Sequence, residues 1–262
     1  MLAVFAKEVG NPPVELTHQP LEYANNIPKS KNEISQVFTS SRPNATLFQF
    51  SDGSFMAMSH VDESPLHPRF FMAVDEIFCI FVGDVENISD LRKHYGLSRN
   101  SNEATLIIEV YKVLRDRAPY PSDQVIKDLV GNFAFILYDA KSHSIFAARD
   151  RDGGMKLHWG VANDGSLVLS DDVEIFPDFC GMTSSSFPTG CIFTNKTGLT
   201  SFVHPLYKVR GYRQEDGEGR ISGVYFQVDI YSRLPSIPRV GSAQTWGDDQ
   251  TGESGLADIQ EG

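Results

Sequence analysis

The sequence lacks the short patterns that mark the common catalytic and cofactor sites. Its 7 histidines are scattered without an HExxH pair, and neither CxxC nor GxSxG occurs. The dipeptide Gly153-Gly154 lacks the strand, GxGxxG loop and helix of a dinucleotide site. HExxH brings two imidazoles to one metal ion, and GxSxG places a serine on a sharp turn. We therefore expect no metal site and no cofactor.

Cysteine and long apolar runs are also scarce. The 3 cysteines, Cys79, Cys180 and Cys191, are odd in number and have no metal-ligand spacing. Such usage suits a reducing compartment, so we expect the cytosol, the nucleus or both. No stretch approaches the roughly 20 apolar residues that a membrane span needs. The sequence therefore predicts no membrane span.

Basic residues are outnumbered by acidic ones. The chain has 23 Lys and Arg against 34 Asp and Glu, a formal net charge of -11. Basic patches supply most of the affinity for nucleic acids, so we expect no nucleic-acid partner. From Pro235 onward the chain is rich in Pro, Gly, Ser and Asp. We predict one domain over residues 1–232 and a polar, acidic, disordered tail over residues 233–262.

The remaining sequence alternates between strand and helix patterns. Two regions rich in strand formers, residues 46–82 and 133–203, flank a helical region. That region carries apolar side chains at i, i+3, i+4 and i+7, which share one helix face: Ile107, Val110, Tyr111 and Leu114. Ser101 or Asn102 can cap this helix, and Ser122 and Gly131 bound a second one. This order predicts two sheets with helices packed outside them.

Three segments carry a family resemblance in their order and spacing. They are Phe81–Asn87, Asp128–Asp139 and Ala148–Gly160. Together they resemble the N-terminal glutaminase domain of class II glutamine amidotransferases. Ser170-Asp171-Asp172 and Phe187–Gly190 extend the similarity.

Two further motifs make the chain similar to one plant group. Tyr95–Leu97 reads YGL and Leu114–Arg117 reads LRDR; both are typical of the aluminium-induced proteins, also called the stem-specific type. The resemblance implies an α+β fold, a four-layer αββα sandwich of the N-terminal-nucleophile hydrolase type. Gly96 suits the position after a helix end, and the LRDR charges suit a helix C-terminus. For both motifs we expect a structural role.

The residues needed for glutamine hydrolysis are replaced. By the resemblance, Leu2 stands at the position of the nucleophilic cysteine, and Val82 at the asparagine of the oxyanion hole. Leu2 has no nucleophilic atom, and its bulk disfavours removal of Met1. Val82 cannot donate a side-chain hydrogen bond, and losing one such donor costs about 3 kcal/mol of transition-state stabilisation. Gly83 beside it still carries a backbone N–H.

A weakened ligand pocket is compatible with these changes. The resemblance points to Arg42, Gly83, Asp84 and Glu103 as its remnant residues. The alternative is that Arg42 is a solvated loop residue and that Glu103 only favours a helix N-terminus. The oligomeric state stays open, with a homodimer as one alternative.

We therefore expect a catalytically inactive amidotransferase-like protein. Its role would be binding or regulatory, in the plant stress or growth response, with a protein partner or small-molecule ligand that is unknown. Two alternatives remain. One is a glutaminase or amidase with an unconventional nucleophile. The other is a sensor of glutamine or another small metabolite that uses the remnant pocket.

Overall fold

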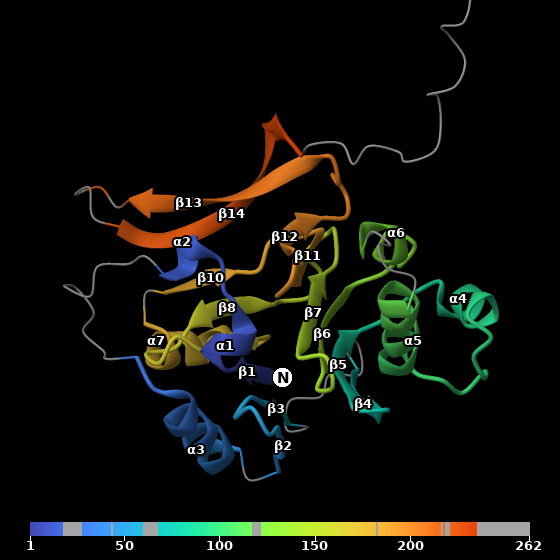
Figure 1. The fold of residues 1–262 in the computed structure, drawn as a ribbon, viewed down its shortest axis with the longest axis horizontal. Coiled ribbons are helices and arrows are strands. Elements are labelled where there is room, and N and C mark those ends of the chain that lie inside the picture. The colour runs from blue at the N-terminus through green and yellow to red at the C-terminus, as the bar shows by residue number, and fades with distance from the viewer. Residues whose placement is uncertain are drawn as a thin grey trace, which may run out of the picture.

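Two antiparallel β-sheets pack face to face and carry helices on both outer faces (Figure 1). The computed structural model describes residues 1–17, 28–42, 44–59, 68–116, 122–181, 183–215, 217 and 221–234. The resulting four-layer αββα sandwich confirms the fold class expected from the resemblance. Of the expected tail, only Arg233 and Leu234 lie within the described residues.

The first sheet has six strands in the order β10-β8-β9-β1-β3-β2. Its strands are β1 (Leu2–Phe5), β2 (Thr46–Gln49), β3 (Phe55–Met58), β8 (His158–Val161), β9 (Leu167–Ser170) and β10 (Ser184–Ser186). Strand β1 lies in the middle, with Leu2 opposite Ala57 on one side and Ser170 on the other. The start of the chain is therefore held inside a sheet.

The second sheet has eight strands in the order β14-β13-β12-β11-β7-β6-β5-β4. They are β4 (Arg69–Val74), β5 (Ile77–Gly83), β6 (Phe133–Asp139), β7 (Ser144–Arg149), β11 (Cys191–Thr194), β12 (Gly198–Ser201), β13 (Tyr207–Glu215) and β14 (Ile221–Arg233). Six of these strands lie in, or at the edge of, the two strand-rich regions expected from the sequence. Strands β13 and β14 lie beyond those regions.

Helices cover the two outer faces of the sandwich (Figure 1). The described helices are α1 (Lys7–Gly10), α2 (Val14–Thr17), α3 (Lys31–Ser41), α4 (Ile88–His94), α5 (Glu103–Asp116), α6 (Ser122–Ile126) and α7 (Phe176–Phe179), with a 3-10 turn at Val173–Ile175. Helices α3 and α7 pack on the six-stranded sheet and α4 to α6 on the eight-stranded one, whereas α1 and α2 contribute Val9 and Leu16 to the cluster between the sheets. Asn102 caps α5, because its side-chain oxygen accepts the Thr105 N–H at 2.9 Å. None of the helices in these described stretches has the length and apolar character to cross a bilayer.

Three apolar clusters fill the three interfaces between the layers. One lies between the sheets and includes Phe5, Tyr138 and Trp159. The second joins the eight-stranded sheet to α5 and α6. The third joins the six-stranded sheet to α3 and α7, and Leu2 and Phe38 belong to it. Alternate residues of β1 thus serve two interfaces, as the period of two in a strand requires.

The YGL motif forms the end of α4. The Leu97 N–H donates to the Arg92 carbonyl at 2.8 Å, and the Gly96 N–H to the Lys93 carbonyl at 3.3 Å. This bonding pair, with Gly96 at φ 67°, is a Schellman motif. Gly96 therefore has the structural role expected from the sequence, at the position after the helix end.

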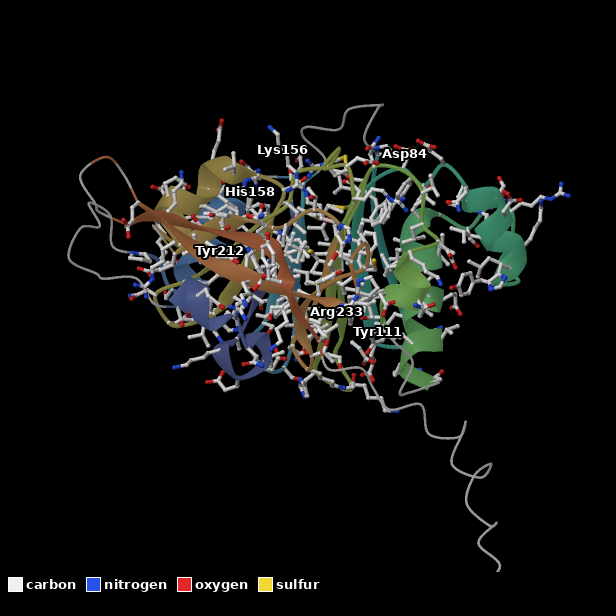
Figure 2. The ribbon with its side chains drawn as sticks, turned by 90° about the horizontal axis from the view of Figure 1, so that it is seen from above. Asp84, Tyr111, Lys156, His158, Tyr212 and Arg233 are labelled. Atoms are coloured by element: carbon white, nitrogen blue, oxygen red, sulfur yellow. The ribbon has the colours of Figure 1, made fainter. Side chains whose placement is uncertain are left out.

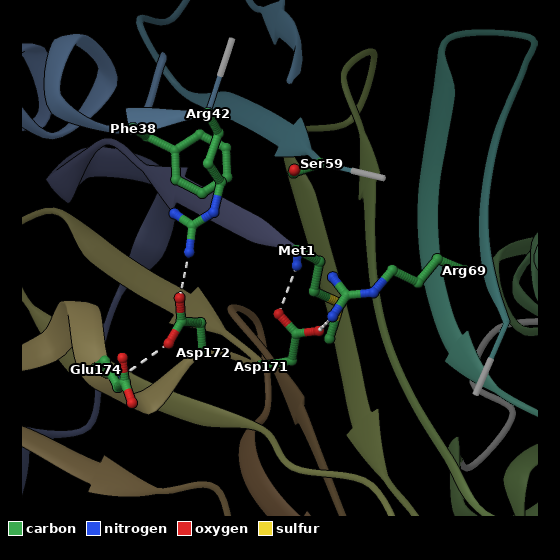
Figure 3. Close-up of a pocket in the computed structure, with 8 residues that line it drawn as sticks. All are labelled: Met1, Phe38, Arg42, Ser59, Arg69, Asp171, Asp172 and Glu174. Atoms are coloured by element: carbon green, nitrogen blue, oxygen red, sulfur yellow. Dashed lines mark hydrogen bonds and ion pairs between the residues drawn. The ribbon is translucent and has the colours of Figure 1, made fainter. Parts of the chain in front are cut away.

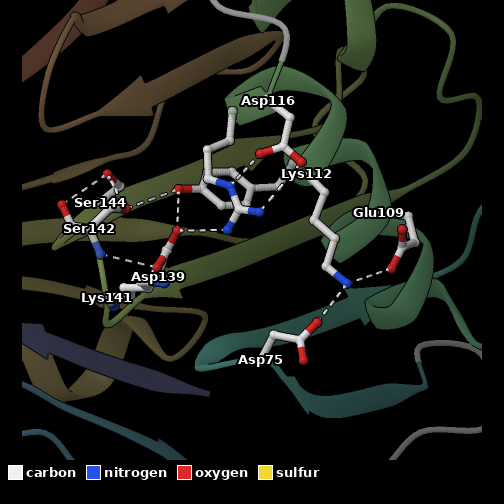
Figure 4. Close-up of polar contacts among 10 residues, drawn as sticks. Asp75, Glu109, Lys112, Asp116, Asp139, Lys141, Ser142 and Ser144 are labelled. Atoms are coloured by element: carbon white, nitrogen blue, oxygen red, sulfur yellow. Dashed lines mark hydrogen bonds and ion pairs between the residues drawn. The ribbon is translucent and has the colours of Figure 1, made fainter.

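The LRDR motif ties the end of α5 to the β6–β7 turn (Figure 4). Asp139, the last residue of β6, accepts a hydrogen bond from the Tyr111 hydroxyl at 3.0 Å and lies 3.5 Å from Arg115. Asp116 in turn pairs with Arg115 at 2.8 Å. The last motif residue, Arg117, lies outside the described part of the chain.

One edge of the sandwich gathers strand ends from both sheets. Figure 2 shows Asp84, Lys156 and His158 along this edge of the molecule, and Tyr111 at the opposite edge. Asp84 follows the end of β5, and His158 begins β8. Asp84, one of the residues expected to form a site, therefore lies at this end.

Candidate functional site

A polar pocket of about 320 Å³ opens at the start of β1 (Figure 3). Its lining residues come from both sheets, α3 and the segment after β9: Met1, Phe38, Arg42, Ser59, Arg69, Asp171, Asp172 and Glu174. Such a volume is at the low end of the range for small-molecule sites. The pocket therefore suits a ligand of a few heavy atoms with polar groups.

On its inner side, the pocket is lined by a series of ion pairs that links the two sheets. The Met1 amine lies 2.5 Å from one oxygen of Asp171, directly after β9. The other oxygen of Asp171 lies 2.7 Å from the Arg69 guanidinium, at the start of β4. Arg69 belongs to the eight-stranded sheet, and Asp171 follows a strand of the six-stranded one. The ion pair between them therefore connects the two sheets.

The outer wall is built around Arg42. Its guanidinium pairs with the Asp172 carboxylate and lies 4.6 Å from the centre of the Phe38 ring. Asp172 also accepts the Glu174 N–H at 3.0 Å. Arg42 is therefore a partly buried residue of the pocket lining.

Burial dominates the electrostatics of the Met1 amine. Loss of water lowers the pKa of this amine, Asp171 opposes that shift, and Arg69 adds to it. A lowered pKa favours the neutral amine, which can both donate and accept a hydrogen bond. The amine is not free for a substrate, however, because Asp171 already binds it.

Leu2 lies outside the pocket. Its side chain is fully buried and packs in the cluster shared with α3 and α7. The Met1 side chain, in contrast, belongs to the cluster between the sheets. The position that resembles the nucleophile is thus occupied by a core side chain.

The expected oxyanion position is closed as well. Val82 is 1% exposed and packs between the sheets. The Gly83 N–H donates to the Pro68 carbonyl at 3.0 Å. Gly83 itself has φ 105°, and a Cβ there would lie 2.0 Å from the Asn132 carbonyl oxygen. The geometry requires glycine for close packing, and its N–H is already bonded.

Asp84 and Glu103 lie close enough to interact with each other but do not line this pocket. Burial raises the pKa of Glu103; its own backbone N–H and Arg92 oppose that shift, and Asp84 adds to it. The neighbouring Asn102 lines another hollow, of about 370 Å³, which shares Arg69 with the pocket at Met1. Of the four candidate residues, only Arg42 therefore lies in the pocket.

The loop after β7 supports this end of the sandwich. Asp150 is fully buried and accepts the N–H groups of Gly154 at 2.9 Å and Met155 at 3.0 Å. The Arg149 guanidinium donates to the carbonyls of Met155 at 2.6 Å and Phe187 at 2.8 Å. Arg149 and Asp150 of the family motif therefore stabilise the loops after β7 and β10.

Several pocket residues were not identified from the sequence. Asp171 and Asp172 were recorded only as part of the family similarity. Their position directly after a predicted strand could have indicated that they belong to a site. Arg69 and Ser59 gave no signal, since their roles depend on contacts between distant segments. His158 is a further neighbour: burial and then Arg149 and Lys156 lower its pKa, which favours the neutral ring.

The described residues bring no three His, Cys, Asp or Glu side chains together in a way that could hold a metal ion. The pocket instead offers two guanidinium groups, each paired with an aspartate, and the carboxylate of Glu174. Such an arrangement can exchange its internal ion pairs for those of a charged ligand. Ser59 is the one hydroxyl or thiol side chain among the described lining residues.

Comparisons with known proteins agree with the sequence motifs. A family model described as "Aluminium induced protein" matches residues 2–228. The stem-specific protein TSJT1 of Nicotiana tabacum is 50% identical over 149 residues, which are 57% of this chain and 100% of that protein.

Glutamine-hydrolysing asparagine synthetases are more distant relatives. The enzyme of Escherichia coli, asparagine synthetase B, is 24% identical over 67% of this chain, and a probable enzyme of Dictyostelium discoideum is 37% identical over 29%. The chain spans only 32% and 13% of these two proteins.

Among solved structures, the glutamine phosphoribosylpyrophosphate amidotransferase of B. subtilis aligns with a TM-score of 0.48 at 11% identity. The alignment covers 77% of this chain and 48% of that one.

Proposed function

The chain belongs to the aluminium-induced protein family, and we propose that it is a non-hydrolytic member of the amidotransferase-like group. In this proposal the pocket at Met1 binds a small polar metabolite. Binding serves a regulatory role in the stress or growth response of plants, and the protein has no catalytic turnover.

One observation carries the proposal: the side chain of Leu2 is fully buried against α3 and α7. Acyl transfer needs a nucleophile at the substrate carbonyl and a base beside it. A leucine in the core supplies neither. Losing a nucleophile can lower turnover by a factor of about a million in a well-studied hydrolase.

The pocket itself supports retained binding. Arg42 and Arg69 keep their guanidinium groups within it, and Asp171, Asp172 and Glu174 balance them. Charged and polar groups held in fixed positions give a site its specificity. A ligand with both acidic and basic groups would match this wall.

Turnover and binding can be tested separately on the purified chain. We expect no ammonia release from glutamine, and an intact mass that retains Met1. We also expect a panel of polar metabolites to contain at least one that raises the melting temperature, as a ligand of the folded state must. Arg42→Gln should abolish that shift, whereas the control Arg99→Gln, at an exposed loop residue, should retain it.

Two results would count against the proposal. Ammonia release by the unmodified chain, above a matched blank, would refute the loss of hydrolysis. A melting-temperature shift that survives Arg42→Gln unchanged would place the ligand elsewhere.

Ser59 favours a second candidate function. Its hydroxyl is the one side chain in the described pocket wall that could attack a carbonyl. If the chain is an amidase with this unconventional nucleophile, Ser59→Ala should abolish ammonia release. The first proposal expects no release from either protein.

The proposed role is in the cytosol, the nucleus or both. The 3 cysteines are free and buried, which is compatible with a reducing compartment. Cell fractionation would test the location, and light scattering at several concentrations would test whether a homodimer forms.

A further inference from the structure

A second cleft lies at the same end of the sandwich, between the loops and strand β14. It encloses about 480 Å³ and is separate from the pocket at Met1, because the two share no lining residue. Its walls come from the loops after β7, β10 and β12 and from Phe226–Val228 of β14. This volume lies within the range of small-molecule sites.

Part of the lining of the cleft is apolar. Pro188, Cys191, Phe226 and Val228 contribute to it. The buried hydroxyl of Ser201 is already used, since it donates to the Gly190 carbonyl at 3.1 Å and accepts the His204 N–H at 3.0 Å. These apolar residues offer contact area to a hydrocarbon or aromatic group, and Thr189 adds a further hydroxyl to the described lining.

The rim carries one cation and one anion that have no partner among the described residues. Arg151 and Asp152 both line the cleft, and neither has an ion pair or side-chain hydrogen bond with the rest of the described chain. In contrast, the nearby Arg42, Arg69, Asp171 and Asp172 are all paired. A ligand with an anionic group, a cationic group and an apolar group would therefore complement this cleft.

We propose that this cleft binds a small zwitterion with an apolar side group, of the class of the free aromatic and aliphatic α-amino acids. The Arg151 guanidinium binds the ligand carboxylate, and the Asp152 carboxylate binds its ammonium group. The side group lies on Phe226 and Val228. Hydrogen bonds to charged groups are the stronger ones in proteins, so both rim residues contribute to affinity.

Trp159 provides a local reporter. Its ring centre lies 5.0 Å from that of Phe226, so a ligand on Phe226 should change its emission. The chain has 2 tryptophans, Trp159 and Trp246. A Trp246→Phe background leaves Trp159 as the one tryptophan whose emission is followed.

The experiment titrates this protein with L-phenylalanine and with three analogues. We expect saturable binding of L-phenylalanine and at least about tenfold weaker binding of 3-phenylpropanoate, phenethylamine and glycine, which lack the ammonium, the carboxylate and the side group. Arg151→Gln and Asp152→Asn should each weaken L-phenylalanine binding about tenfold. Arg99→Gln is the matched control at an exposed arginine, and it should retain the affinity.

Any of three results would overturn the inference. They are no saturable response to L-phenylalanine, equal binding of the analogue without an ammonium group, and an affinity that neither rim variant changes. Arg42→Gln separates the two pockets: loss of L-phenylalanine binding in that variant alone would place the amino acid in the pocket at Met1 and reject this cleft.

Discussion

At the scale of single residues, the most informative feature is how buried acidic groups are satisfied. Asp139 is 1% exposed, yet it accepts hydrogen bonds from two backbone N–H groups, a tyrosine hydroxyl and an arginine (Figure 4). Burial alone would raise its pKa, but hydrogen bonds from Ser142, Tyr111 and Arg115 outweigh burial and lower it. The LRDR motif therefore stabilises a charged carboxylate inside the protein.

This lowered pKa predicts a pH dependence of stability. A carboxyl group with a lower pKa in the folded state stabilises the fold above its unfolded pKa, which is about 3.9 for aspartate. That stabilisation is lost as the pH falls through the folded value. The free energy of unfolding, measured with urea between about pH 5 and pH 2, should therefore fall less steeply for Asp139→Asn than for the parent chain.

Asp90 offers the control for this measurement. It pairs with Lys93 at 3.1 Å, but its side chain is 81% exposed. Exposed pairs contribute little to stability, so Asp90→Asn should keep the slope of the parent chain. Equal slopes for all three proteins would contradict the role given to Asp139.

Without the resemblance, pocket residues could be predicted from the sequence only where they do not depend on a contact between distant segments of the chain. Arg42 was identified through the resemblance, and it lines the pocket. Arg69 and Asp171 were not, because the ion pair between them joins two sheets. Periodicity describes one element at a time and carries no information about such pairs.

At the scale of elements, two glycines allow the energetic cost of a positive φ to be distinguished from the cost of a steric clash. Gly96 has φ 67°, and a Cβ added there would meet no atom within 4 Å. Gly83 has φ 105°, and its Cβ would lie 2.0 Å from the Asn132 carbonyl oxygen. Gly96→Ala should cost about 1 kcal/mol, the penalty of a left-handed residue. Gly83→Ala should cost more than about 3 kcal/mol, because the β5 end must also move.

Urea unfolding of the two alanine variants checks this order. Each variant controls for the other, since both replace a glycine of positive φ at the end of an element. Similar losses from the two substitutions would show that the close approach of Gly83 to Asn132 has no energetic weight.

Element prediction succeeded where one face is buried and the other is exposed. Helix α5 has its apolar stripe and its Asn102 cap, and both were readable from the sequence. Strand β13 was missed because its burial is shallow: Lys208, Arg210 and Arg213 are exposed, and Gly211 interrupts the pattern. A strand without a strong inward face gives little period-two signal.

At the scale of the whole molecule, two polar links join the sheets at opposite ends. Arg69 and Asp171 form one beside the pocket. At the other end, the Tyr138 hydroxyl of β6 donates to Asp52 in the β2–β3 turn, and His143 lies 3.0 Å from the same hydroxyl. Burial and the Asp52 carboxylate raise the pKa of Tyr138, which keeps the hydroxyl protonated as a donor.

Tyr138→Phe should therefore destabilise the sandwich. The change removes one hydrogen bond to the partly buried Asp52, which keeps the Ser54 N–H as a donor, and a hydrogen bond to a charged group contributes about 1.5 kcal/mol or more. Tyr212→Phe, at a partly exposed tyrosine of β13, should stay within about 0.5 kcal/mol of the parent chain. Equal free energies of unfolding in urea for the parent and Tyr138→Phe would refute the link.

The buried amine of Met1 has a practical consequence. A purification tag fused ahead of this residue would convert the amine into an amide and leave Asp171 with a weaker partner. The first strand would then begin beside a foreign peptide at the mouth of the pocket. Recombinant protein meant for ligand screening should therefore carry its tag at the other end, because an N-terminal fusion would alter the ion pair that lines this pocket.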